Sequence, residues 1–174
     1  KIEAVNAARQ QAATISQQFQ AAANKGDVET MTAKLAEFEK LESGSAAVPQ
    51  MKMTLLVAKK DWAGIEKSLN ETTGNARDVA VMVLARRLNS QTNSACPEEY
   101  LKKFTAAYAQ SIEKGRTSTP LDFVTLASLQ WKSGNKDAAV AAARKGLDAA
   151  KAMPAGRMPL APFEKYVQAI ESGN

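Results

Sequence analysis

Cys96 is the first residue to consider for chemistry, because the 174-residue chain contains one cysteine and no histidine. The segment Cys96-Pro97-Glu98-Glu99 suits the first turn of a helix, where the helix dipole can lower the pKa of a thiol and raise its reactivity. Histidine is the usual base beside a catalytic cysteine and the commonest metal ligand. Glu98 and Glu99 are adjacent, so they lie on different helix faces and make a poor acid–base pair. We therefore favour a semi-buried, unreactive Cys96 and expect no catalytic residue, no metal ion and no cofactor.

Basic residues are the second candidate, since the formal net charge is +5. They come in short doublets, namely Lys59-Lys60, Arg86-Arg87, Lys102-Lys103 and Arg144-Lys145. A face that binds nucleic acid usually gathers its basic residues into one stripe, whereas isolated doublets are typical of solvated helix edges. We expect no nucleic-acid partner. A module that binds a small ligand or nucleic acid through these doublets is an alternative, and its affinity would fall steeply with salt.

The composition predicts one folded, soluble domain over residues 1–174, because 45% of the residues are hydrophobic and 24% are charged. No stretch approaches the ~18 apolar residues that cross a bilayer, so we expect no membrane insertion. The chain begins at Lys1 without a signal-like segment, which indicates a processed form or a piece of a longer protein. A periplasmic or secreted location is one option.

Apolar residues recur at helical spacing through most of the chain, which predicts an all-α fold. Val28, Met31, Leu35 and Phe38 form such a stripe, and we interpret it and Trp62 as core. The run 79–83 is rich in valine, but helix formers on both sides favour a buried helix over a strand.

Three breaks between these helical segments share one form: Lys25-Gly26-Asp27, Lys59-Lys60-Asp61 and Ser133-Gly134-Asn135. Each places a residue that can end one helix before an Asp or Asn that can cap the next. Such short connections favour antiparallel neighbours, so each break predicts the bend of a helical hairpin.

The spacing of the breaks indicates a repeat. Lys60 follows Gly26 by 34 positions, another 34 positions lead to Ser94, and Gly134 comes 40 positions later. An interval near 34 residues is typical of solenoids built from helical hairpins. We predict four hairpins and a ninth helix that starts near Pro162 and covers the last exposed core.

The last hairpin resembles the tetratricopeptide repeat family over about a fifth of the chain. The matching positions run from the family's large aromatic residue, through its turn glycine, to a late apolar residue. They are Phe123, Leu126, Ala127, Gly134, Ala139 and Leu147. The positions that depart are Gln130, Ala143, Gly146 and a late Pro154. The first two hairpins match the family only in turn and period. The resemblance implies antiparallel helical hairpins, stacked as a short solenoid with a C-terminal capping helix, and a protein or peptide partner.

Small residues along this last hairpin favour close helix packing. Ala139, Ala143, Gly146, Leu147 and Ala150 form one face, and small side chains allow two helices to approach closely. A glycine within a helix costs about 1 kcal/mol relative to alanine, which close packing at Gly146 would offset.

The glycine turn and the alanine-rich helix after it also resemble the C-terminal helical extensions of some bacterial thioredoxin-like proteins. This second resemblance implies a redox-associated accessory domain as an alternative function. No thioredoxin motif lies in the sequence itself.

A solenoid of this kind presents a concave groove lined by the first helix of each hairpin. The tetratricopeptide resemblance places eight residues in it, which we call the predicted groove: Ser16, Gln20, Asn24, Gln50, Thr54, Arg86, Ser128 and Trp131. Trp131 either anchors a partner there or packs against the preceding hairpin. The predicted groove lacks the ordered Lys/Asn/Arg set with which tetratricopeptide proteins hold a terminal carboxylate. The function we favour is a non-catalytic module for protein–protein interaction or an accessory scaffold.

Overall fold

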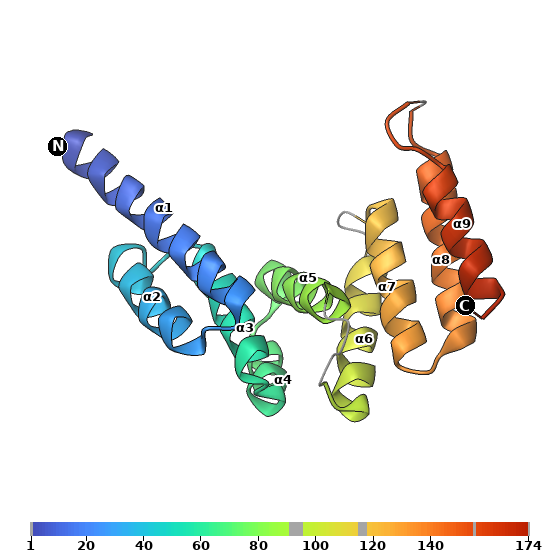
Figure 1. Ribbon diagram of the computed structural model, residues 1–174, viewed down its shortest axis with the longest axis horizontal. Coiled ribbons are helices and arrows are strands. Elements are labelled where there is room, and N and C mark those ends of the chain that lie inside the picture. Colours follow the sequence, from blue (N-terminus) through green and yellow to red (C-terminus); the bar gives the residue numbers. More distant parts are fainter. Residues whose placement is uncertain (1, 91–95, 115–117, 155, 174) are drawn as a thin grey trace. The chain divides into compact units, whose positions relative to one another are not determined.

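The computed structural model describes residues 2–90, 96–114, 118–154 and 156–173, and all regular structure within these ranges is helical (Figure 1). The helices are α1 (Ile2–Lys25), α2 (Val28–Leu41), α3 (Ala47–Lys59), α4 (Trp62–Glu71), α5 (Gly74–Ser90), α6 (Glu98–Glu113), α7 (Pro120–Lys132), α8 (Lys136–Lys151) and α9 (Ala161–Glu171). The predicted all-α class is confirmed. The valine-rich run 79–83 is part of α5, and α9 begins one residue before the predicted Pro162.

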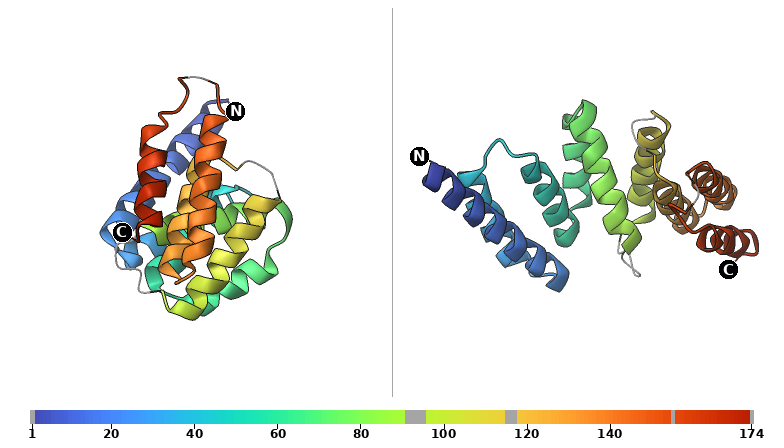
Figure 2. Two further views of the ribbon diagram at one scale, coloured as in Figure 1. Left: turned by 90° about the vertical axis from the view of Figure 1, so that its right-hand side faces the viewer. Right: turned by 90° about the horizontal axis from the view of Figure 1, so that it is seen from above.

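The contacts between residues divide the chain into two compact units, a first unit of Lys1–Leu84 and a second unit of Ala85–Asn174. In the first unit, α1 contacts α2 and α3, α2 contacts α3, and α3 contacts α4. In the second unit, α7 contacts α6 and α8, and α8 contacts α9. The helices α7 and α8 lie side by side in each view (Figures 1 and 2). Helices α1 to α4 and helices α6 to α9 thus each pack against their neighbours in sequence, while the single domain and the stacked solenoid stay predictions.

The three predicted breaks have the backbone geometry that ends a helix. Gly26, Lys60 and Gly134 have φ angles of +71°, +56° and +82°, in the left-handed region. Glycine takes this conformation without steric cost, but at Lys60 the chain pays about 1 kcal/mol or more for it. Two backbone hydrogen bonds stabilise that turn, from Lys60 N to Val57 O and from Asp61 N to Leu56 O. The fourth break, predicted near Ser94, lies outside the described residues.

Each of these turns is followed by the predicted cap. The side chains of Asp27, Asp61 and Asn135 each accept a hydrogen bond from the backbone N–H three residues later. The cap satisfies one of the N–H groups that the first turn of a helix leaves without a partner. A left-handed residue followed at once by a capping side chain therefore reverses the chain within two or three residues.

The core of the first unit is formed by apolar faces of α1, α2 and α3. Phe19 and Met31 have no exposed surface, and Leu35 and Phe38 are also buried, which confirms the predicted core stripe. The cluster consists of Ala12, Ile15, Phe19, Ala22, Met31, Leu35, Phe38, Val48, Met51 and Leu55. Trp62, at the start of α4, is buried as predicted.

In the second unit, α7 packs tightly against α8 at Gly146. A Cβ atom added there would lie 3.1 Å from Phe123 Cβ and 3.2 Å from the carbonyl oxygen of Pro120. Ala139, Ala143 and Ala150 on the same face of α8 are buried. Leu147 is the one residue of the predicted small face that is only partly buried, and no side chain fits at Gly146 unless α7 moves.

A buried polar network joins α6 to the start of α7. Tyr108 on α6 has no exposed surface, and its hydroxyl donates to Asp122 Oδ1 at 3.1 Å. The other carboxylate oxygen accepts from the backbone N–H and the hydroxyl of Thr119, at 3.0 Å and 2.8 Å, which completes a capping box at the start of α7. Arg86 Nη2 lies 3.6 Å from Asp122 Oδ1 and balances the buried charge. Burial raises the pKa of Tyr108, and the Asp122 charge adds to this effect.

The contact at Gly146 predicts that Gly146→Leu lowers the free energy of unfolding by about 1–3 kcal/mol, since an overpacked core must shift its neighbours. Ala141→Leu is the matched control, because Ala141 is exposed on the same helix. Thermal denaturation of both variants measures the difference. A melting temperature of Gly146→Leu equal to that of the control would contradict the close packing of α7 and α8.

The network at Asp122 predicts that Tyr108→Phe lowers the free energy of unfolding by about 1–3 kcal/mol at pH 7, because a buried carboxylate loses a donor. The raised pKa of Tyr108 means that the folded chain keeps the phenol protonated at a pH where the unfolded chain ionises it. The stabilisation from Tyr108 is therefore complete below pH ~10 and declines above it. Urea unfolding at several pH values should show that the free energies of unfolding of Tyr108→Phe and of the unsubstituted chain become equal at alkaline pH. A constant difference would contradict this account.

Candidate functional site

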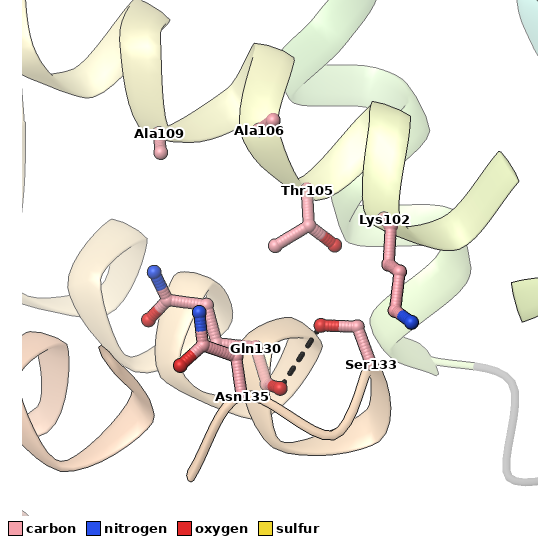
Figure 3. A pocket seen from close by; sticks show the side chains of 7 residues that line it. All are labelled: Lys102, Thr105, Ala106, Ala109, Gln130, Ser133 and Asn135. Carbon is pink, nitrogen blue, oxygen red and sulfur yellow. Dashed lines mark hydrogen bonds between the residues drawn. The ribbon is translucent and has the colours of Figure 1, made fainter. Parts of the chain in front are cut away.

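An open pocket of about 230 Å³ lies in the second unit, between α6 and the end of α7 with its turn to α8 (Figure 3). We call it the α6–α7 pocket. Its lining residues are Lys102, Thr105, Ala106, Ala109, Gln130, Ser133 and Asn135. The four from α6 are spaced i, i+3, i+4 and i+7, so they share one face of that helix. Side chains from α6 and from the α7 side face one another across the space (Figure 3).

Two polar atoms of the α6–α7 pocket are buried without a hydrogen-bond partner, Thr105 Oγ1 and Gln130 Oε1. A threonine within a helix commonly donates to the carbonyl four residues back, as buried Thr54 does to Gln50 O at 3.0 Å. Thr105 is equally buried but makes no such bond. A buried polar group without a partner costs about 1–3 kcal/mol, so both atoms favour a molecule that pairs with them.

The other polar groups give the α6–α7 pocket both donors and acceptors. Ser133 Oγ donates to Gln130 O at 3.0 Å and keeps its lone pairs as acceptors. Asn135 Oδ1 caps α8, which leaves its amide nitrogen as a donor toward the pocket. Lys102 Nζ lies 2.6 Å from Glu98 Oε1, and both side chains are exposed. The lining is therefore neutral apart from one lysine that already pairs with a carboxylate.

Five residues of the predicted groove belong to the first unit. Gln20, Asn24 and Gln50 are exposed, and Ser16 is partly buried. Thr54 is buried, with 6% of its surface exposed, and its hydroxyl is bonded within its own helix. Thr54 therefore offers little surface to a partner, whereas the three amide side chains are accessible.

Three residues of the predicted groove belong to the second unit. Arg86 is exposed and pairs with Asp122, and Ser128 is partly buried. Trp131 is partly exposed, and Lys136 Nζ lies 5.1 Å from the centre of its rings. None of the three lines the α6–α7 pocket.

The α6–α7 pocket was not predicted from the sequence, because the tetratricopeptide resemblance places a groove on the first helix of each hairpin. The signal that could have found it is the face of α6 that carries Lys102, Thr105, Ala106 and Ala109. Two alanines beside a threonine at helical spacing indicate a place with little side-chain volume and a polar group. Gln130 was noted only as a departure from the tetratricopeptide pattern, where a tyrosine is typical.

Cys96 lies two residues before the start of α6, ahead of the N-cap residue Pro97, and is 8% exposed. Burial raises the pKa of its thiol to about 11. This direction is opposite to the one that a helix dipole would give, and its cause is desolvation of the thiolate, in agreement with the unreactive Cys96 that we favoured. The thiol stays protonated at neutral pH and is a poor nucleophile.

Two further searches cover only the described part of the chain. No group of three or more His, Cys, Asp or Glu side chains there could hold a metal ion. No helix there is both long and apolar enough to cross a membrane.

In comparisons with known proteins, no family model, no curated protein and no solved structure matches the chain. The function must therefore be argued from the helices and the α6–α7 pocket themselves.

The raised pKa of Cys96 predicts slow alkylation. The shift from 9.0 to about 11 lowers the thiolate fraction at pH 7 about hundredfold, and burial slows the reaction further. Iodoacetamide labelling followed by mass spectrometry should show a folded chain that reacts at least that much more slowly than the chain in urea. Equal rates in the folded and the unfolded chain would show a reactive, accessible thiol.

Proposed function

We propose that this chain is a non-catalytic helical module that binds a protein partner, with a short extended segment of that partner in the α6–α7 pocket. The observation that carries the proposal is that Thr105 and Gln130, from opposite walls of one open pocket, each hold a buried polar atom without a partner, Thr105 Oγ1 and Gln130 Oε1. A peptide segment brings one donor and one acceptor with each residue, so it can pair with both walls at once.

The size and charge of the α6–α7 pocket fit a segment of polypeptide. Its volume of about 230 Å³ is below the ~300 Å³ at which sites for drug-sized ligands begin, which suits a few residues of a chain. Lys102 pairs with Glu98, and Lys103 pairs with Glu99 at 3.0 Å. Because these glutamates neutralise the basic doublet, phosphate binding through it is disfavoured relative to a neutral peptide.

The arrangement of the helices that we propose is a tetratricopeptide-like stack of hairpins. Three turns of one geometry, at Gly26, Lys60 and Gly134, support it, and so does the contact between consecutive helices within each unit. The alternative redox-associated role finds no support in Cys96, whose buried thiol stays protonated.

Selection of peptides from a displayed random library on the full 174-residue chain tests the proposal. We expect selected peptides to bind the chain and the Ala141→Leu control alike. Ala106→Leu should weaken their binding at least about tenfold, because the larger side chain occupies the α6–α7 pocket. Ala106 and Ala141 are both exposed helix alanines of the second unit, so the two variants make the same substitution in similar surroundings. Enrichment of no peptide over an immobilised control protein would refute peptide binding.

A further inference from the structure

We infer that the α6–α7 pocket recognises the main chain of an extended peptide, through the Gln130 carboxamide and the Thr105 hydroxyl, and therefore accepts many side-chain sequences. This inference rests on the proposed function and adds the chemistry of recognition to it.

Gln130 supplies the first contact. Its carboxamide carries an acceptor and two donors in one plane, which matches the C=O and N–H that one residue of an extended chain presents on the same side. Gln130 Oε1 has no partner within the protein. This oxygen is also buried, so the Gln130 side chain must turn toward the pocket before a main-chain N–H can pair with the oxygen and the neighbouring C=O can accept from the amide nitrogen. A carboxylate or a phosphate at this place would leave the oxygen without a donor.

Thr105 supplies the second contact from the opposite wall. Its hydroxyl can donate and accept, and rotation about χ1 exchanges hydroxyl and methyl between the staggered positions. One such rotation turns the buried Oγ1 toward the pocket, where it donates to a second carbonyl of the segment. The hydroxyl gives up no hydrogen bond in this rotation, because it has none within the protein.

The small residues of α6 leave room for the backbone of a peptide in the α6–α7 pocket. Ala106 and Ala109 carry only methyl groups beside Thr105, so a peptide backbone can approach the wall (Figure 3). The lining holds one cation, Lys102, and this lysine is exposed and paired with Glu98. The pocket thus offers hydrogen bonds of the kind a backbone makes and no charge that would select an acidic or a basic side chain.

A titration with N-acetyl-trialanine amide tests main-chain recognition, because this peptide has no side chain larger than methyl. Shifts of the backbone amide signals of the isotope-labelled full chain report where it binds. We expect the signals of Ala106, Ala109 and Asn135 to move during the titration. Methylation of the central peptide nitrogen removes one N–H and should weaken binding at least about tenfold. Glucose, which offers hydroxyl groups in place of peptide units, should move none of these signals.

Two matched threonine variants separate binding from folding. Thr105→Val should weaken binding of the trialanine peptide about tenfold and leave the free energy of unfolding equal or higher, because the lost hydroxyl had no partner. Thr54→Val, at an equally buried threonine whose hydroxyl is bonded, should leave binding unchanged and slightly destabilise the chain. A merely structural Thr105 would show the opposite stability effect and no change in binding.

Three results would overturn the inference. They are the absence of pocket shifts up to about 10 mM peptide, equal binding of the N-methylated peptide, and shifts with glucose that match those with the peptide. If library peptides still bind and Ala106→Leu still blocks them, the proposed function stands and recognition depends on side chains. If no library peptide is selected either, both the function and the inference fail.

Discussion

The buried carboxylate of Asp122 is the interaction on which the second unit depends. It forms a capping box with Thr119 at the start of α7 and accepts a hydrogen bond from the Tyr108 hydroxyl of α6. Arg86 is its counter-charge. A carboxylate this deeply buried is tolerated only when its oxygens are paired, so the three partners are held in place together. Because α6 and α7 form the two walls of the α6–α7 pocket, this network joins the helices that carry Thr105 and Gln130.

The helices and their turns could be predicted from the sequence because both are local. The Asp and Asn caps need only a few neighbouring residues, and helical spacing identified the buried stripe that includes Met31 and Leu35. Gly146 was also within reach, since a glycine in an alanine-rich helix has few explanations other than close packing. Lys60 took the left-handed conformation without being a glycine, because backbone hydrogen bonds on both sides of the turn hold it there.

The α6–α7 pocket could not be predicted in the same way, because it arises between helices. Thr54 and Thr105 look alike in sequence, both on apolar helices, yet one hydroxyl is bonded to its own helix and the other has no partner. That difference depends on side-chain rotamers and on what α7 places opposite. For Cys96 the sequence indicates a helix start, which favours a lowered thiol pKa, but it does not reveal the burial of the thiol, which raises that pKa.

The placement of the two tryptophans has a practical consequence for the question of one domain or two. Trp62 lies in the first unit and is buried, whereas Trp131 lies in the second unit and is partly exposed. Each unit thus carries its own fluorophore, in surroundings of different polarity. Two variants that each keep one tryptophan would report the denaturation of the first and of the second unit separately by fluorescence. Coincident transitions would show that the two units unfold cooperatively, and separate transitions would show that they unfold independently.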